Sequence, residues 1–563
     1  MRASAVCLGL FAAFAEIVFA ALLPELSPYI SSVLHNVPAR AGPAVPRNRE
    51  PTSRQKAHND ANALEQGQYE KRDAPTASIV VPMTQFGNYS ADPTAVSVAL
   101  QASTDPAGAA KAADAMPYIA NNNTAIPLGN NIISDDSDGG NGYAWSSSFN
   151  FVANADASGD PDSGWQALPT LDGFTLNRTV EIRDGAIQPV YVTANYNAES
   201  IKRAIIVFPG KPRDSWKYTN LVRNALNVQA GLFPEWGVTN DSVLIMGIAW
   251  LNEADQAAGA VQTNELVFHG TQWQSGGVST APTTLNRSIT TYEVVDRFTD
   301  ILFDKAQFPK LNQVVVAGHS MGGQMVQRYA LLKKTKKYDQ NMQFWAGNPG
   351  SYAWLTDNRP YTNDSCVDPL QWHYGIGGNQ TKITKYARKD VVTNRQAVVD
   401  RFLSRKMHLA LGLLDNGAGD THCEARLQGG NHLDRGSQFA IQISGISEAN
   451  GWPASHTLDY IVGVSHQDYA MMSSNASLQR IFYDDFNTRH PDLTNTTNPG
   501  DQLHPVYKQK DFATPRHKIA AYGLLFGSIG GIALGFTILP FLFSNNLPLS
   551  QQIYWEKAEV SSN

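Results

Sequence analysis

The most constraining feature of this 563-residue chain is a short segment from Val314 to Gln324, which reads VVVAGHSMGGQ. Its opening run of small apolar residues predicts a buried strand, and the residues after Ser320 are compatible with a helix. Gly318 and Gly322 lie two positions to either side of Ser320, where a sharp strand-to-helix turn leaves little room for a side chain. The segment therefore predicts a turn that presents Ser320 at a helix N-terminus, where developing negative charge is favoured.

This strand is one of six short apolar runs that indicate a sheet. They lie at residues 204–208, 243–246, 314–317, 344–346, 408–414 and 460–464. Continuous apolar runs of this length are typical of strands buried on both faces. Segments that can form helices, such as 292–303 and 324–332, separate several of them, and this alternation predicts a mostly parallel α/β sheet.

The G-x-S-x-G pattern between a strand and a helix resembles the nucleophile elbow of the α/β-hydrolase superfamily, in the form found in microbial esterases and lipase-like enzymes. The resemblance covers residues 173–490, a little over half of the chain. It implies an α/β-hydrolase fold, in which helices flank a mostly parallel sheet and a cap segment lies between Asn348 and Arg405. The implied activity is that of a serine hydrolase, most simply a carboxylic ester hydrolase. A serine peptidase and a catalytically silent adhesion or binding domain are the alternatives on the same fold.

The resemblance also implies the order of the catalytic residues, which is serine, acid and then histidine. Asp415 follows the run 408–414 in a G-x-x-D pattern, and Asp420 is its rival five positions later. His466 follows the last apolar run, whereas His432 has no strand before it and His456 precedes the strand. A serine hydroxyl needs a base to accept its proton, and the base needs a carboxylate to orient it. The expected triad is therefore Ser320, Asp415 and His466.

Two backbone N–H groups are expected to stabilise the oxyanion. One belongs to Met321, the residue after the nucleophile, and the other to the loop Pro209–Pro212, which resembles the family's HGxP loop. Proline has no N–H to donate, so Lys211 is favoured and Gly210 comes second.

The cap segment contains aromatic residues that either line an acyl pocket or pack the cap, namely Trp354, Trp372 and Tyr374. It also contains Cys366, and Cys423 follows the acid loop. These two cysteines remain once Cys7 is removed with a signal peptide, and in an oxidising compartment they are expected to form a disulfide.

The N-terminal part of the chain is expected to carry targeting and processing signals. Residues 1–20 resemble a signal peptide that ends in Val18-Phe19-Ala20, with an uncleaved anchor as the alternative. Residues 21–72 are interpreted as a disordered pro-region or linker. It ends in Lys71-Arg72, which is either a convertase site or an ordinary exposed basic pair. Residues 73–172 form an extension rich in Gly, Asp and Ser.

The C-terminal part predicts a single membrane span. After a linker at 491–518, residues 519–543 carry no charge and are long enough to cross a bilayer as a helix. Glycines at every fourth position could line a helix–helix dimer face or could be ordinary for such a helix: Gly523, Gly527, Gly531 and Gly535. A polar tail follows at 544–563.

The expected location of the catalytic domain is luminal or extracellular. The basic residues Arg516 and Lys518 would favour the opposite orientation, but large domains cross membranes largely regardless of charge. The chain also carries nine N-glycosylation acceptor motifs between the apolar segments, at Asn88, Asn122, Asn177, Asn240, Asn286, Asn363, Asn379, Asn475 and Asn495.

Composition excludes several other classes of protein. The formal charge is −6 and long basic runs are absent, which argues against nucleic-acid binding. Three cysteines are too few for a disulfide scaffold. The acidic segments 135–140 and 156–162 lack the spaced glutamate of a calcium loop and are interpreted as solvated loops. The serine-hydrolase interpretation implies no metal or organic cofactor.

Overall fold

The computed structural model describes residues 152–412, 415, 417–446, 453–461 and 464–488, together with residue 101 and the backbone of residues 70–71. The predictions for the signal peptide, the pro-region, the linker at 491–518, the span at 519–543 and the polar tail fall almost entirely outside these residues. Within the described ranges, no helix combines the length and the apolar character needed to cross a bilayer.

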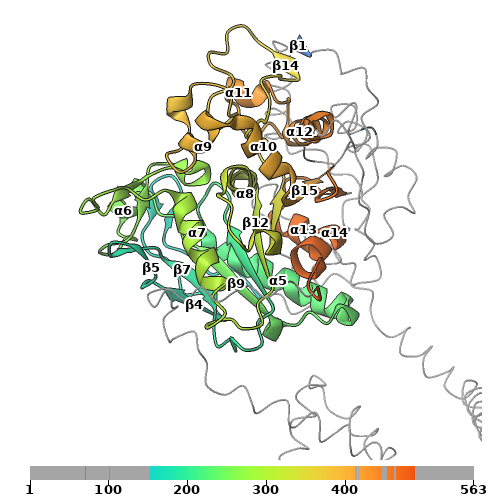
Figure 1. The fold of residues 1–563 in the computed structure, drawn as a ribbon. Coiled ribbons are helices and arrows are strands. Elements are labelled where there is room, and N and C mark those ends of the chain that lie inside the picture. The colour runs from blue at the N-terminus through green and yellow to red at the C-terminus, as the bar shows by residue number, and fades with distance from the viewer. Residues whose placement is uncertain are drawn as a thin grey trace, which may run out of the picture. The chain divides into compact units, whose positions relative to one another are not determined.

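The centre of the fold is an eight-stranded sheet (Figure 1). Its strands, in spatial order, are β16 (His456–Ile461), β15 (Lys406–Gly412), β13 (Met342–Gly347), β12 (Gln313–His319), β8 (Arg203–Phe208), β9 (Val243–Ile248), β7 (Val190–Thr193) and β4 (Phe174–Asn177). The six strands from β16 to β9 pair in parallel, and β7 and β4 add an antiparallel edge. The sheet is therefore mostly parallel, as the sequence predicted.

The helices cover both faces of this sheet because the central strands are apolar on both sides. In β8, Ala204 and Ile206 pack into one core cluster, whereas Ile205 and Val207 pack into the other. The first cluster also takes residues from α7 (Thr291–Leu302), α8 (Met321–Leu332), α10 (Arg395–Leu403) and α12 (His432–Ile446). The second takes residues from α5 (Ser215–Leu232), α13 (Asp468–Ser473) and α14 (Asn475–Leu478). Full burial of each such aliphatic side chain contributes about 1.5–3 kcal/mol.

The remaining elements are short. They include α6 (Glu253–Ala258), α9 (Arg388–Thr393) and α11 (Cys423–Arg426). Four two-stranded pairs also occur: β1 (Glu70–Lys71) with β14 (Tyr361–Thr362), β2 (Gly159–Asp160) with β3 (Gly164–Trp165), β5 (Glu181–Arg183) with β6 (Ala186–Ile187), and β10 (Val267–Phe268) with β11 (Ser279–Ala281). Residues 152–172 pack on α5, where the ring of Trp165 lies 4.9 Å from that of Trp216.

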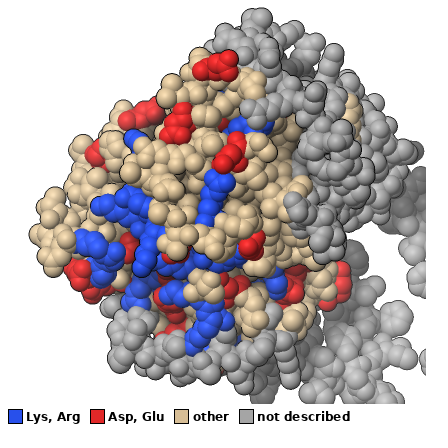
Figure 2. All heavy atoms as spheres, turned by 45° about the horizontal axis from the view of Figure 1, so that its top comes forward, with Lys and Arg blue, Asp and Glu red and all other residues tan. Residues whose placement is uncertain are grey.

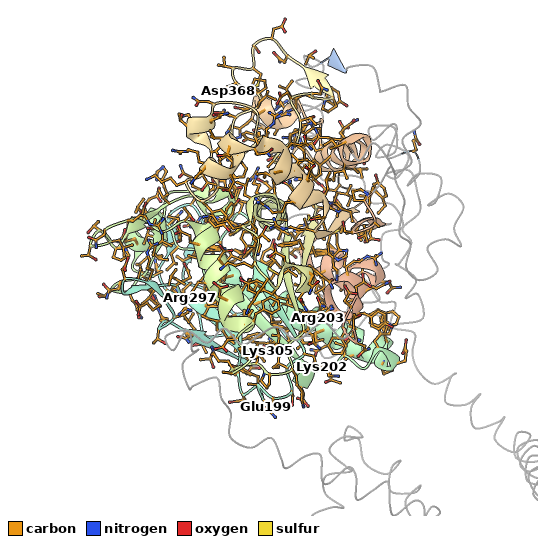
Figure 3. The ribbon with its side chains drawn as sticks, in the orientation of Figure 1. Glu199, Lys202, Arg203, Arg297, Lys305 and Asp368 are labelled. Atoms are coloured by element: carbon orange, nitrogen blue, oxygen red, sulfur yellow. A yellow bond between two sulfur atoms is a disulfide. The ribbon has the colours of Figure 1, made fainter. Side chains whose placement is uncertain are left out.

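The order in which the chain adds strands to the sheet reverses beside β8, and this reversal determines where a site can form. From β8 the chain passes to β9 on one side, and it then returns to β12 on the other side and continues outward to β16. In open parallel sheets, ligands bind beyond the carboxyl ends of the strands at such a switch point. Arg203 begins β8 at the opposite, amino ends of the strands. Figure 3 shows it far from Asp368 of the cap segment.

The last predicted strand differs most in its limits from the strand observed. The last strand begins at His456 and ends at Ile461, whereas the sequence predicted 460–464 and placed His456 before it. His456 pairs with Met407 and is 4% exposed, so the polar residues that begin this strand concealed its true start. The run predicted at 408–414 corresponds to β15, which spans Lys406–Gly412, and residues 413 and 414 lie outside the described residues.

Candidate active site

Ser320 occupies the tight turn between β12 and α8. Its backbone has φ 57° and ψ −122°, a conformation that costs a non-glycine residue free energy and is held by its surroundings. The N–H of Ser320 donates to the carbonyl oxygen of Gly347 at 2.8 Å, and its own carbonyl oxygen accepts from the N–H of Gln324 at 3.0 Å. These two bonds tie the turn to β13 and to the first turn of α8.

The glycines around Ser320 are required by close backbone packing. A Cβ on Gly318 would lie 2.5 Å from the backbone carbonyl of Gly322. A Cβ on Gly322 would lie 2.6 Å from the carbonyl oxygens of Phe208 and Pro209 at the end of β8. Neither contact is possible for a real side chain, so any larger residue would displace the start of α8.

Three predicted residues meet at the carboxyl ends of the strands although they lie far apart in the sequence. The hydroxyl oxygen of Ser320 lies 2.9 Å from Nε2 of His466, and Nδ1 of His466 lies 2.7 Å from Oδ2 of Asp415. An ionised carboxylate can only accept, so Nδ1 carries the proton and Nε2 is left to accept from Ser320. In enzymes with a serine nucleophile, a relay of this geometry activates the serine.

Asp415 lies in the loop after β15. The predicted run 408–414 had placed it directly at the end of the strand. The strand ends at Gly412, where a Cβ would lie 2.6 Å from the carbonyl oxygen of Val464. Asp415 is held instead by two backbone bonds, in which its N–H donates to Gly412 and its carbonyl oxygen accepts from the N–H of Leu433. Its side chain is completely buried.

Asp420, the rival acid, does not reach His466. One of its oxygens accepts from Nδ1 of His422 at 2.6 Å, and the other accepts from the hydroxyl of Ser351 at 3.0 Å. Burial opposes its ionisation, but these bonds and the nearby Arg435 guanidinium lower the pKa of Asp420 well below its usual range. It is an ionised carboxylate with a structural set of partners.

Sequence reasoning missed a second histidine beside Asp415. Nδ1 of His432 lies 3.0 Å from Oδ1 of Asp415, although the two groups lack the alignment of a hydrogen bond. The His432 ring also lies 4.1 Å from the ring of His466. His432 is the first residue of α12, and its N–H donates to the carbonyl oxygen of Gly417 in the acid loop. No strand precedes it, so the motif gave no signal for this contact.

His319 lies against His466 from another side, with 4.7 Å between the ring centroids. Within the described residues neither of its ring nitrogens has a hydrogen-bond partner. Burial lowers the pKa of His319 well below 6.5 and also lowers that of His432, so both rings are neutral. Burial likewise opposes ionisation of Asp415, yet His432 and His466 hold its pKa well below the usual range. The site therefore places one ionised carboxylate among rings of which at least two, those of His319 and His432, are neutral.

The two favoured oxyanion donors face the same cavity as Ser320. Met321 begins α8 and Lys211 follows β8, and both residues line this cavity, whereas Gly210 does not. Neither backbone N–H has an acceptor within the described part of the chain. A Cβ on Gly210 would lie 2.6 Å from the hydroxyl of Tyr218, so Gly210 serves the close packing of this loop.

The cavity has a volume of about 990 Å³ and is roofed by the cap segment. Trp372 and Tyr374 line it, and Nε1 of Trp372 donates to the carbonyl oxygen of Ser275 at 2.8 Å. Trp354 is buried and packs against Phe439 of α12 instead. The aromatic residues of the cap thus divide between the two roles that the sequence left open. A second cavity of about 950 Å³ lies at the amino ends of β15 and β16, and no predicted site residue lines it.

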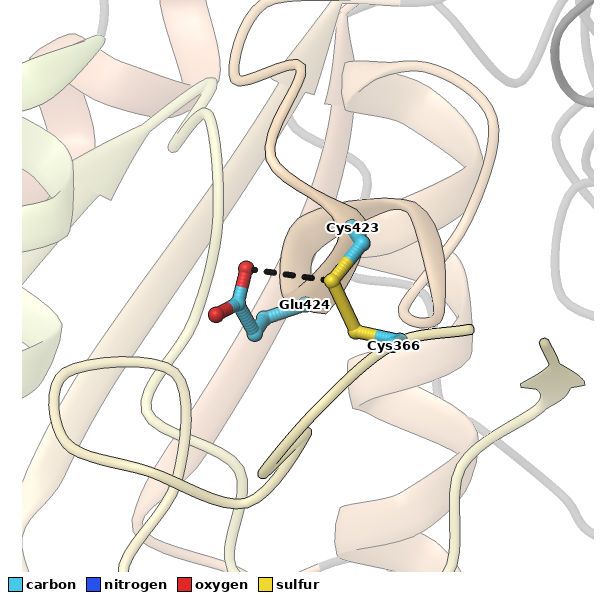
Figure 4. Close-up of side chains that lie close together, drawn as sticks. All are labelled: Cys366, Cys423 and Glu424. Atoms are coloured by element: carbon cyan, nitrogen blue, oxygen red, sulfur yellow. Dashed lines mark hydrogen bonds between the residues drawn. A yellow bond between two sulfur atoms is a disulfide. The ribbon is translucent and has the colours of Figure 1, made fainter. Parts of the chain in front are cut away.

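Cys366 of the cap segment and Cys423 of α11 form a disulfide, with their Cα atoms 5.7 Å apart (Figure 4). The bond joins the cap to the segment that follows the acid loop. The carboxylate of Glu424 lies 3.6 Å from Sγ of Cys423.

Two groups of side chains in the described ranges have the spacing of metal ligands. One consists of Cys366, Cys423 and Glu424, and the other of Asp415, His432 and His466. The sulfurs of the first group are bonded to each other, and the second group contains the serine–histidine–acid relay. Both arrangements are explained without a metal.

The sheet order, the strained turn at Ser320 and the sequence order of serine, acid and histidine define an α/β-hydrolase fold. No protein-family model matches the sequence, and neither does any curated protein sequence.

Solved structures similar to this chain include poly(aspartic acid) hydrolase-1 from Sphingomonas sp. KT-1. The two sequences are 18% identical, the match covers 55% of this chain and 99% of that chain, and the TM-score is 0.38. The poly(3-hydroxybutyrate) depolymerase LpqC from Bordetella parapertussis has 18% identity, covers 57% and 92% of the two chains, and has a TM-score of 0.38. The siderophore hydrolase EstB from Aspergillus nidulans has 12% identity, covers 56% and 97%, and has a TM-score of 0.31.

Proposed function

We propose that this chain is a serine hydrolase that cleaves carboxylic esters through an acyl-enzyme on Ser320. The observation that carries the proposal is the continuous relay from Ser320 through His466 to Asp415, which opens on a cavity of about 990 Å³. A catalytically silent binding domain would not need this relay.

The reaction begins when Nε2 of His466 takes the hydroxyl proton of Ser320 and the serine oxygen attacks the ester carbonyl carbon. The N–H groups of Met321 and Lys211 stabilise the oxyanion, a contribution that typically amounts to a factor of about 10²–10³ for each donor. The imidazolium then protonates the leaving alcohol, and the acyl group stays on Ser320. Water activated by His466 releases the acid and restores the serine.

Asp415 acts in this scheme by holding His466 in the tautomer that accepts from serine and by stabilising the imidazolium. His432 touches the other oxygen of the same carboxylate, so it contributes to positioning Asp415. The rings of His319 and His432 both lie against the ring of His466, and this packing limits its rotation.

A fluorophosphonate probe tests the activated serine directly. The full-length chain should be labelled covalently on Ser320, and both Ser320→Ala and His466→Ala should abolish labelling. Failure of the folded wild-type chain to react would favour the silent domain. Labelling combined with cleavage of peptides but not of esters would favour a serine peptidase on the same fold.

We also propose that the catalytic domain is membrane-anchored and faces the lumen or the exterior of the cell. The apolar segments at both ends of the sequence and the Cys366–Cys423 disulfide support this location, since disulfides persist in oxidising compartments. The span would be the segment 519–543, with its four glycines available to a partner helix.

The glycosylation acceptors differ in exposure, and this difference provides an internal control for the test of the proposed location. Asn240, Asn286 and Asn379 are exposed, whereas Asn177 and Asn475 are buried. Digestion with a glycosidase should increase the gel mobility of the natural protein, and Asn379→Gln should remove one glycan, whereas Asn475→Gln should remove none. Absence of any mobility shift, together with access of cytosolic protease to the domain, would contradict the proposal.

A further inference from the structure

The cavity beside Ser320 carries an excess of positive charge. Four cationic side chains line it, namely Lys211, Lys382, Lys385 and Arg388, and only two carboxylates do so, namely Asp420 and Glu424. Three of the cations come from one short segment of the cap that ends in α9. The complete chain has a formal charge of −6, so this excess does not reflect a basic protein. Figure 2 shows Lys and Arg side chains gathered across the middle of one face.

The cations are not neutralised by neighbouring acids. Lys211, Lys382 and Lys385 are exposed, and none of them forms an ion pair within the described residues. Arg388 is half-buried and held in place, since its Nε donates to the carbonyl oxygen of Ile383 at 3.0 Å and its Nη2 donates to that of Thr381 at 2.7 Å. Both acceptors are neutral carbonyl groups, so the full charge of the guanidinium remains.

The two carboxylates, in contrast, already have partners. Asp420 accepts from His422 and from Ser351 and lies near the buried Arg435. Glu424 is 8% exposed and accepts from the side-chain amide of Gln371. Both acids are therefore bound into the wall, whereas the lysines extend from the rim into solvent.

We propose that the site selects acyl esters that carry an anionic group, a carboxylate or a phosphate, away from the ester bond. Lys382, Lys385 and Arg388 form the surface that attracts this group while the ester carbonyl lies at Ser320. A cleft lined by one sign of charge focuses the field and raises the local concentration of oppositely charged substrates. This inference rests on the proposed esterase activity and adds the class of substrate.

The experiment compares matched esters on the full-length chain, with acid release followed in a pH-stat. Monoethyl adipate carries a carboxylate on the acyl side, and ethyl hexanoate is its neutral counterpart. The butanoyl ester of 6-hydroxyhexanoic acid carries a carboxylate on the alcohol side, and hexyl butanoate is its neutral counterpart. Each pair of esters is one arm of the experiment. The arm in which the anionic ester is preferred shows whether the acyl side or the alcohol side of the ester faces the cap.

In at least one arm, kcat/KM for the anionic ester should exceed that for its neutral counterpart. The double variant Lys382→Ala/Lys385→Ala should lower this ratio roughly tenfold, the order expected for loss of two exposed charge interactions. Raising the salt concentration from about 0.02 M to about 0.5 M should also lower the ratio, because exposed charges are screened. Lys389→Ala is the matched control, since Lys389 is an exposed lysine of α9 that does not line the cavity.

The outcomes separate this inference from the proposed function. If neutral esters are cleaved in a Ser320-dependent manner, but neither arm shows a ratio above one that falls in the double variant, the inference is wrong and the esterase proposal stands. An equal fall of the ratio in Lys389→Ala would also overturn it, because the effect would then be one of total charge. If no ester in either arm is cleaved, the proposed function itself fails.

Discussion

Replacing Asp415 and Asp420 in turn should separate catalysis from stability. In Asp415→Asn, an amide N–H₂ that faces His466 would force the imidazole proton onto Nε2, where it can no longer accept from Ser320. With the amide reversed, the histidine keeps its tautomer but loses the negative charge that stabilises the imidazolium. Turnover should therefore fall by about 10⁴, the loss typical of a serine triad whose acid is replaced by the amide.

Asp420→Asn should act on a different quantity. It weakens the acceptor for His422 and Ser351 and removes a charge near Arg435. A hydrogen bond to a charged group contributes about 1.5–3 kcal/mol, so the free energy of unfolding should fall by about 2 kcal/mol while turnover changes less than about tenfold.

The assay is ester turnover of both variants beside Ser320→Ala. Circular dichroism confirms folding, and denaturant titration gives the free energy of unfolding. If Asp420→Asn loses as much turnover as Ser320→Ala, while Asp415→Asn retains most of it, the acid has been assigned wrongly.

Three further results are expected. Replacing both Cys366 and Cys423 by serine should lower the free energy of unfolding by about 4 kcal/mol, because the disulfide closes a loop with a sequence separation of 57 residues; an unchanged denaturation midpoint would contradict this. Acidification from pH 6.5 to about pH 4.5 should destabilise the protein by at most about 2.7 kcal/mol for each of His408 and His456. Burial holds the pKa of both residues at about 3, whereas a histidine in the unfolded chain gains its proton near pH 6.5. A denaturation midpoint that stays constant over this range would contradict the prediction. Gly322→Ala should reduce fluorophosphonate labelling strongly, since its Cβ would lie 2.6 Å from two carbonyl oxygens at the end of β8, and labelling at the wild-type rate would refute that packing argument.

The catalytic framework could be predicted from sequence where chemistry and local structure coincide. The turn at Ser320 needs apolar residues before it and glycines around it, and both requirements are visible in the sequence. The parallel strands also show clearly, because burial on both faces demands continuous apolar runs. The structure brings His466 and Asp415 to Ser320, in the order that the resemblance implied.

The remaining features depend on contacts between distant segments. His432 reaches Asp415 because α12 begins beside the acid loop, and no periodicity in the sequence encodes that approach. His456 was placed outside the last strand because a buried histidine that begins a strand does not look apolar. Asp415 is held after β15 partly by the N–H of Leu433, a contact that again joins segments distant in the sequence.

The path of the cap segment has a consequence for how such proteins diversify. The chain leaves the sheet after β13 and returns at β15, and these two strands are direct neighbours. An insertion between adjacent strands can be lengthened, shortened or exchanged without changing any strand pairing. The residues of the cap that line the cavity can therefore vary while the sheet that carries Ser320 keeps its strand pairing.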